Sequence, residues 1–193
     1  MFSKIPLYIL IAISTIFGQS EIWYQKFLST LRNDSGVRFT AQITQKEFEF
    51  NTESEANIEI IDSSHIIFDL DQETIFISGD TIQTYNKLTD QLIIDRIIND
   101  DFGILSLLTG NLNDVSFDKS ILSKDRVKII YSIPEFNYNG YIDILKSGEP
   151  KKMNIVYAKN QFIDIKITNF RFGGLNINTA IRPKPKEIIN LYE

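Results

Sequence analysis

The sequence predicts a single domain of the mainly β class with helices (α+β), in which an antiparallel sheet is closed or nearly closed into a barrel. Three observations support this fold class: many short runs in which apolar and polar side chains alternate, turn-forming residues between these runs, and two apolar segments with helical spacing. The chain of 193 residues is long enough for one domain with a sizeable core. No repeat, low-complexity tract or interdomain linker divides it.

The first 20 residues have the features of a secretory signal peptide. Lys4 provides the positive charge, and an apolar run follows from Ile5 to Phe17. This run is shorter than the roughly 20 residues that a membrane-spanning helix needs. The small residues of Gly18-Gln19-Ser20 predict cleavage after Ser20. We therefore expect a signal peptide at 1–20 and a mature domain at 21–193; an uncleaved anchor is the alternative.

The charge and the absence of cysteine indicate an exported, acidic, soluble domain. The formal net charge is −5, and removal of residues 1–20 takes away Lys4, which leaves −6. Positive charges are not clustered, which disfavours binding to nucleic acid or to an anionic membrane surface. Without cysteine there is no disulfide, and a domain of this size does not require one in a bacterial periplasm.

The first element after the signal peptide is a predicted helix over residues 21–33. Its apolar residues lie at positions that form one stripe on a helix: Trp23, Tyr24, Phe27, Leu28 and Leu31. The strand that follows, at residues 37–44, alternates strictly between apolar and polar side chains, so one face is expected to be buried.

The same reasoning predicts further strands, separated by turn signals such as Ser78-Gly79-Asp80 and Asn139-Gly140. They are expected at about 46–51, 55–62, 65–71, 73–78, 81–86, 89–95, 126–133, 139–146, 151–158 and 162–172. The segment 102–110, FGILSLLTG, reads as a short apolar helix that stops at Gly110. The two helices add more apolar surface than one sheet face requires. They either form ordinary core or line a cavity.

Catalytic groups are scarce. The single histidine, His65, lies in a β-rich segment, cysteine is absent, and no G-x-S-x-G motif occurs. Asp69 and Asp71 could suit calcium or a glycosidase-like pair, but a solvated surface accounts for them more simply. We therefore expect no enzyme activity, no catalytic or metal-binding residue and no cofactor.

The stretch SGDTIQTYNKLTDQLIID resembles a hairpin of the outer-membrane lipoprotein carrier family, LolA, whose pattern is roughly D-G-K-T-x-W-x-Y-(N/D)-P-x-x-x-Q. The matching residues are Gly79, Thr81, Tyr85, Asn86 and Gln91, while Ser78 and Gln83 replace the acidic and aromatic residues. Further likenesses cover nearly the whole mature chain: GVRFTAQITQ, ANIEIIDSSHIIFDL, FGILSLLTGN and FIDIKITNFRFGGLNINTAIRPKPKEIINL.

This resemblance implies a half-open β-barrel with a helical lid that shelters lipoprotein acyl chains. The expected role is a periplasmic, monomeric carrier that receives acylated lipoproteins from an inner-membrane lipoprotein-releasing transporter and passes them to an outer-membrane acceptor. The side chains expected to line the cavity and lid are Trp23, Phe27, Leu31, Val37, Phe39, Ile43, Ile58, Ile60, Phe68, Ile104, Leu107 and Leu108.

One departure from the family concerns the lid. The family carries an arginine that bonds to lid carbonyls, whereas this chain has Ile61-Asp62-Ser63 at that place. Asp62 could instead accept hydrogen bonds, or packing alone could hold the lid. Two other functions remain open: an envelope sensor or protein-interaction module on the same fold, and a small hydrolase that uses His65 or the Asp69/Asp71 pair.

Overall fold

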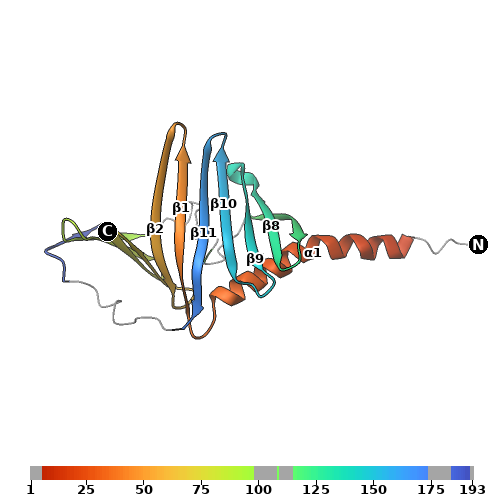
Figure 1. Ribbon diagram of the computed structural model, residues 1–193, viewed down its shortest axis with the longest axis horizontal. Helices are drawn as coiled ribbons and strands as arrows, with labels where there is room; N and C mark the ends of the chain where they lie inside the picture. The colour runs from red at the N-terminus through yellow and green to blue at the C-terminus, as the bar shows by residue number, and fades with distance from the viewer. Residues whose placement is uncertain (1–5, 98–107, 109–114, 174–183, 192–193) are drawn as a thin grey trace, which may run out of the picture.

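The computed structural model describes residues 6–97, 108, 115–173 and 184–191. Within these ranges one α-helix is followed by twelve strands (Figure 1). A short 3₁₀ turn (Pro134–Phe136) joins the eighth strand to the ninth. The elements are α1 (Pro6–Leu31), β1 (Val37–Glu47), β2 (Phe50–Ile60), β3 (His65–Leu70), β4 (Glu73–Ser78), β5 (Thr81–Asn86), β6 (Gln91–Arg96), β7 (Ser116–Leu122), β8 (Arg126–Ile133), β9 (Tyr138–Leu145), β10 (Pro150–Ala158), β11 (Gln161–Phe172) and β12 (Glu187–Asn190).

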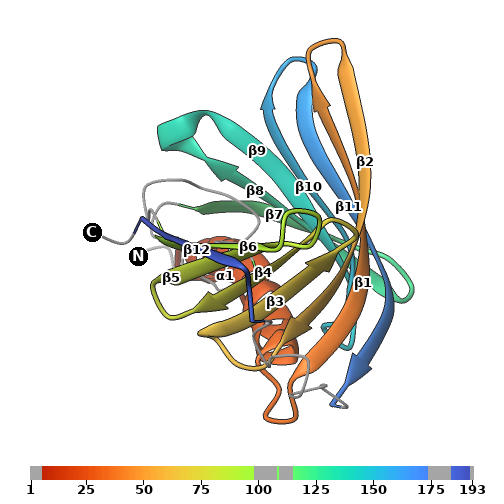
Figure 2. The ribbon, with the colours of Figure 1, turned by 90° about the vertical axis from the view of Figure 1, so that its left-hand side faces the viewer.

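All twelve strands belong to one open sheet. Their order is β12-β6-β5-β4-β3-β2-β1-β11-β10-β9-β8-β7. Neighbouring strands are antiparallel except β12, which pairs in parallel with β6. Since β7 and β12 form the two edges, the described sheet is not closed into a barrel; it curves around α1 (Figure 2). The predicted mainly β class with an antiparallel sheet is confirmed, whereas the predicted closure into a barrel is not found among the described residues.

The predicted helix at 21–33 is confirmed at its C-terminal end, but α1 begins much earlier, at Pro6, and runs without a break through Ser20. Its buried side chains all face the sheet: Ser20, Tyr24, Phe27, Leu28 and Leu31. The helix packs chiefly against β7 and β8. In the part of the chain that the structure describes, no helix combines the length and apolarity needed to span a membrane.

The second predicted helix, 102–110, lies outside the described residues except for Leu108. Leu108 is helical and belongs to the buried apolar cluster. A helical lid is therefore not confirmed, although one residue of the predicted lid is buried on the core side of the sheet.

Three predicted strands, 37–44, 46–51 and 55–62, are in fact two long strands. β1 and β2 pair over eleven residues each and turn at Phe48-Glu49, where Phe48 has a positive φ of 54°. The prediction was wrong here because the tip of this hairpin is solvated on both faces, so alternation disappears although the pairing continues. The edge strands β7 and β12 were missed for a similar reason. Most of their residues are exposed or half-buried.

The remaining predicted strands agree with β3 to β6 and β8 to β11 within two residues at most ends. The pairing of neighbouring strands aligns apolar side chains in rows across the sheet. One row runs from β1 to β8 through the partners Ile43, Ile165, Met153, Ile142 and Ile129. The curved sheet therefore has an apolar inner face, which faces α1, and a mostly polar outer face.

Tyr131 and Gly140 show how closely this inner face is packed. Tyr131 is fully buried, and its hydroxyl donates a hydrogen bond to the backbone oxygen of Asn154 at 2.9 Å. The tyrosine crosses over Gly140, its pairing partner on β9. A Cβ added to Gly140 would lie 2.1 Å from the Asn154 oxygen and 2.6 Å from the Tyr131 hydroxyl.

Gly140→Ala should therefore destabilise the protein by about 2 kcal/mol or more, because backbone or Tyr131 must move to admit the methyl group. Gly79→Ala is the matched control. Gly79 has a positive φ of 63° but no atom within 4 Å of an added Cβ, so only conformational strain of roughly 1 kcal/mol is expected. Urea unfolding of both variants measures the difference. Equal losses would contradict the close packing at Gly140.

Candidate functional site

The inner face of the sheet is the candidate functional site, because most residues predicted to bind lipid meet there. Of the twelve predicted residues, eight belong to the buried apolar cluster: Phe27, Leu31, Val37, Phe39, Ile58, Ile60, Phe68 and Leu108. Trp23 and Ile43 pack against the cluster and are partly exposed. Ile104 and Leu107 lie outside the described residues. The strand parity inferred from alternation thus matches the inner face, while the binding of lipid by these residues stays a prediction.

The prediction missed the second half of the inner face, which comes from β8 to β11. Its buried residues include Val127, Ile129, Tyr131, Ile133, Ile142, Ile144, Met153, Ile155, Ile165 and Ile167. The signal was present in the sequence, because RVKIIYSI at 126–133 alternates as strictly as the first strand. What the sequence did not show is that β11 lies beside β1 and so joins the two halves into one surface.

The buried apolar cluster at the centre of the inner face contains no charged side chain. Two polar side chains are buried among the described residues. Ser20 of α1 lies at the inner face, and Gln83 lies on the opposite side of the sheet. Burial raises the pKa of Tyr24, with a smaller opposing effect of Arg32, and burial also raises the pKa of Tyr131. Both phenols therefore stay neutral at physiological pH. An uncharged apolar cluster of this extent suits contact with hydrocarbon and disfavours ionic groups.

Residues of α1 fill part of this face. Phe27 and Leu31 are completely buried, and Tyr24 packs against Phe117 of β7 with ring centroids 4.8 Å apart. The Gly148 turn between β9 and β10 also lies against the helix, since a Cβ there would be 2.1 Å from the Thr30 hydroxyl. Side chains of α1 therefore fill this part of the inner face.

Trp23 occupies the border between this core and solvent. It is the single tryptophan of the chain, is partly buried against the cluster and has the Lys26 ammonium 5.3 Å from its ring centroid. A change in how α1 packs would alter the surroundings of this ring, so Trp23 is a natural spectroscopic reporter for the inner face.

The residues considered for catalysis lie apart from the inner face and bond to their neighbours. His65 is exposed, and its Nδ1 lies 2.8 Å from Asp62 Oδ2. Asp69 accepts a hydrogen bond from Thr74 and pairs with Lys87, both at 2.8 Å. Within the described ranges, no group of three or more metal-ligating side chains is found.

Asp62, which stands in the place of the family's lid-contacting arginine, bonds within its own turn. One of its oxygens accepts a hydrogen bond from the backbone N–H of Ser64 at 2.7 Å, and the carboxylate also meets the His65 ring. Slight burial raises the pKa of Asp62, but the hydrogen bonds from Ser64 and His65 outweigh this effect, so the pKa is lowered overall. The carboxylate organises the turn between β2 and β3.

Comparisons with known proteins give a likeness of fold. No model of a known protein family matches the chain, and no curated protein matches its sequence. Among solved structures, the chain is similar to an uncharacterized conserved protein from Thermus thermophilus, with a TM-score of 0.59 and 15% identity over 89% of this chain and 99% of that chain.

Two further solved structures have lower scores. One is a LolA superfamily protein from Nitrosomonas europaea, with a TM-score of 0.45 and 7% identity over 84% of this chain and 97% of that chain. The other is a putative outer membrane lipoprotein-sorting protein domain from Vibrio parahaemolyticus, with a TM-score of 0.45 and 10% identity over 85% of this chain and 100% of that chain. The fold is shared with the Thermus protein, and membership of the LolA family is not shown by these comparisons.

The Asp62 turn predicts a specific acid dependence of stability. A carboxyl whose pKa is lowered by folding stabilises the protein above its unfolded value of about 3.9, and this contribution is lost as the pH falls through the lower folded value. Asp62→Asn should therefore be less stable than the unmodified protein near pH 7, and the difference should shrink below about pH 4. Urea unfolding as a function of pH measures it, with Asp71→Asn as the control. A difference that is independent of pH would contradict the assignment.

Proposed function

We propose that the protein is a carrier that shelters the acyl chains of lipoproteins on the inner face of its sheet. The observation that carries this proposal is a continuous, uncharged apolar cluster on the inner face of an open sheet, where the described helix α1 packs chiefly on β7 and β8. The resemblance of the sequence to the LolA family supports the same role.

Energies of transfer support an exchange of helix for lipid. Displacing the apolar side chains of Phe27, Leu28 and Leu31 exposes surface worth roughly 1.5–3 kcal/mol for each side chain, or about 5–9 kcal/mol in total. Sheltering one acyl chain of about 14 carbons gains roughly 11 kcal/mol, at about 0.8 kcal/mol per methylene. The two quantities are of similar size. Loading and release are therefore both accessible, and small differences in affinity among donor, carrier and acceptor set the direction.

The place of the protein in the cell follows from the same proposal. The signal peptide is cleaved after Ser20, and the mature domain works in the periplasm as a monomer. It takes acylated lipoproteins from an inner-membrane releasing transporter and delivers them to an outer-membrane acceptor. Among the side chains that the structure describes, the apolar residues by which α1 joins the core follow Ser20, so cleavage leaves them in the mature protein.

Binding of an acylated peptide should change the fluorescence of Trp23. We expect a triacylated lipopeptide to shift the emission, and a lipopeptide with brominated acyl chains to quench it, because the chains enter beside this ring. The same peptide without acyl chains should have no effect. Trp23→Phe checks that the signal comes from this residue. No response to either acylated peptide, together with no lipid retained on native purification, would contradict the carrier role and favour an interaction module.

A charge on the inner face should weaken this binding. Ile43→Glu places a carboxylate at a partly exposed inner position, where an acyl chain would desolvate it, so the dissociation constant should rise at least about tenfold. Thr44→Glu is the matched control, since it adds the same charge to the outer face of the same strand. The quenching titration compares the two variants. Equal loss of affinity in both would place the ligand elsewhere.

Cleavage is tested by the N-terminus of the exported protein. Expression of the full chain in a bacterium should give a periplasmic protein that begins at Glu21, as read by N-terminal sequencing. Ser20→Phe, which removes the small residue from the cleavage site, should leave the precursor uncut. A membrane-bound chain that retains residues 1–20 in the unmodified protein would support the anchor instead.

A further inference from the structure

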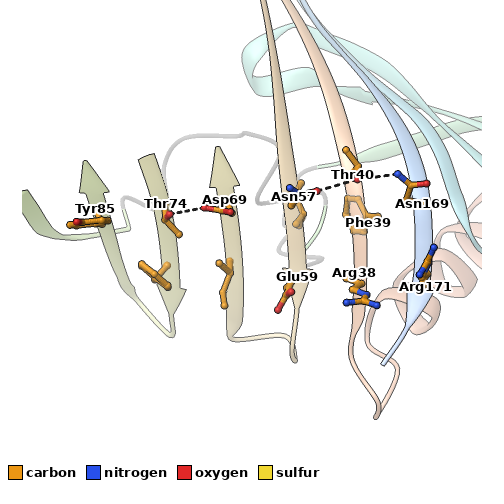
Figure 3. Close-up of a pocket in the computed structure, with 13 residues that line it drawn as sticks. Arg38, Phe39, Thr40, Asn57, Glu59, Asp69, Thr74, Tyr85, Asn169 and Arg171 are labelled. Carbon is orange, nitrogen blue, oxygen red and sulfur yellow. Dashed lines mark hydrogen bonds between the residues drawn. The ribbon is translucent and has the colours of Figure 1, made fainter. Parts of the chain in front are cut away.

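The outer face of the sheet, opposite to the apolar core, carries a groove of about 710 Å³ (Figure 3). It extends across β11, β1, β2, β3, β4 and β5, and we call it the outer groove. Its polar lining residues alternate along the strands with core residues; on β1, for example, Arg38 lies between Val37 and Phe39. A groove of this volume is within the range of small-molecule sites.

Two arginines lie side by side at one end of the outer groove. Arg38 of β1 and Arg171 of β11 are direct partners in the antiparallel register, so their Cβ atoms are about 5 Å apart on the same face. Like charges in this arrangement are destabilising. Glu59 of β2 is the partner of Arg38 on its other side. Within the described residues, no ion pair reaches Arg171. This end of the groove therefore attracts an anion.

A β-bulge brings Arg171 and Asn169 to this groove. The β1–β11 register shifts between Arg38 and Thr40, and Asn169 takes a left-handed backbone with φ of 55°. The extra residue lets Phe170 stack on Phe39 in the core, with centroids 6.1 Å apart, while Asn169 and Arg171 both line the outer groove (Figure 3). A non-glycine residue in this conformation is held at a cost of about 1 kcal/mol.

A row of neutral hydrogen-bonding groups lies next to the arginines. Asn169 donates to the Thr40 hydroxyl at 3.4 Å, and that hydroxyl donates to the Asn57 amide oxygen at 3.2 Å (Figure 3). This row orients two side-chain amides over three neighbouring strands. Amides and hydroxyls that are held in this way can bond to the hydroxyl groups of a ligand.

Glu59 supplies an acceptor that lacks a donor. Its Oε2 atom is buried, and no hydrogen-bond partner reaches it within the described residues. A buried carboxylate oxygen without a donor is costly, so the site calls for a ligand hydroxyl at this position. The other carboxylate of the groove, Asp69, is already neutralised by Lys87 at 2.8 Å and does not compete with the arginines.

The far wall of the outer groove is aromatic, from Phe76 and Tyr85. The Tyr85 hydroxyl donates a hydrogen bond to Asp90 at 2.8 Å, which fixes the ring, and this bond raises the pKa of the phenol. The ring is therefore neutral and held in place. It presents an apolar face on which a ligand ring can pack.

We propose that the outer groove binds a small acidic carbohydrate, a hydroxylated ring that carries a phosphate or carboxylate group. Arg38 and Arg171 bind the anionic group, because the planar guanidinium matches the geometry of both anions. Asn57, Asn169 and Glu59 bond to the ring hydroxyls, and the aromatic wall packs against the ring. Since the groove and the inner face lie on opposite sides of the sheet, a lipid held by the inner face cannot place its head group here. The ligand therefore binds free in solution.

Titration calorimetry of the purified full chain tests the ligand class with four probes. Glucose 6-phosphate and glucuronate should bind, whereas glucose and inorganic phosphate should bind at least about tenfold more weakly, because each lacks one half of the interaction. Absence of binding by both acidic sugars would overturn the proposal. Inorganic phosphate binding as tightly as glucose 6-phosphate would also overturn it, since the hydroxyl row and aromatic wall would then contribute nothing.

Variants assign the binding to the outer groove. Arg171→Gln should raise the dissociation constant for glucose 6-phosphate at least about tenfold. Lys166→Gln is the matched control: it removes one positive charge from an exposed position of the same strand, outside the groove, and should leave affinity unchanged. Asn169→Gly keeps the left-handed backbone but removes the amide, so it should weaken binding while the melting temperature stays close to that of the unmodified protein. Equal affinity of Arg171→Gln and the unmodified protein would overturn the proposal.

An experiment with lipid vesicles distinguishes binding of a free ligand from binding to a membrane surface. We expect any sedimentation of the protein with vesicles of phosphatidylcholine and phosphatidylglycerol to be independent of Arg171. The Arg171→Gln variant and the unmodified protein should therefore sediment to the same extent. Sedimentation that depends on Arg171, without binding of the free acidic sugars, would overturn the proposal in favour of a membrane contact. Because acyl-chain binding on the inner face is measured separately by Trp23, failure of this proposal leaves the carrier function standing, and the reverse is also true.

Discussion

The register of the central strand β1 with its two neighbours is the constraint on which the rest of the structure depends. β1 pairs with β2 on one side and with β11 on the other, and both pairings place apolar residues opposite apolar ones. A slip of β1 by one residue against its neighbours would turn β1 over, moving Val37 and Phe39 into solvent and Arg38 into the core. The cost of burying that guanidinium without a partner is several kcal/mol, so the pairing is strongly specified.

Two surfaces of opposite character follow from this single constraint. The inner face gathers uncharged apolar side chains around α1, and the outer face gathers arginines, amides and carboxylates over the same strands. The bulge at Asn169 allows both surfaces to be continuous where β11 meets β1. It restores Phe170 to the core and directs Arg171 outward. A single sheet can thus present an apolar surface on its inner face and an anion-binding surface on its outer face.

The sequence was informative wherever one face of a strand is buried and the other solvated. Val37, Phe39 and Ile43 were placed on the correct face by alternation alone, and so were Ile58, Ile60 and Phe68. The hairpin tip at Phe48 could not be located, because both faces of β1 and β2 are wet there. The strand β12 could not be predicted from the sequence for a different reason. Its four residues gain their place from parallel pairing with β6, which local sequence does not encode.

Contacts between residues that are distant in the sequence could not be predicted either. Arg38 and Arg171 lie far apart in the sequence, and no local pattern indicates that they share one groove.

The pairing of β1 with β11 also determines when the protein can fold. β1 begins at Val37, whereas its partner β11 ends at Phe172, so the two strands are far apart in the sequence. The two halves of the sheet can join only after β11 has been synthesised, and pairing strands so far apart in the sequence is slow. A nascent chain that has not yet reached β11 therefore lacks a finished core.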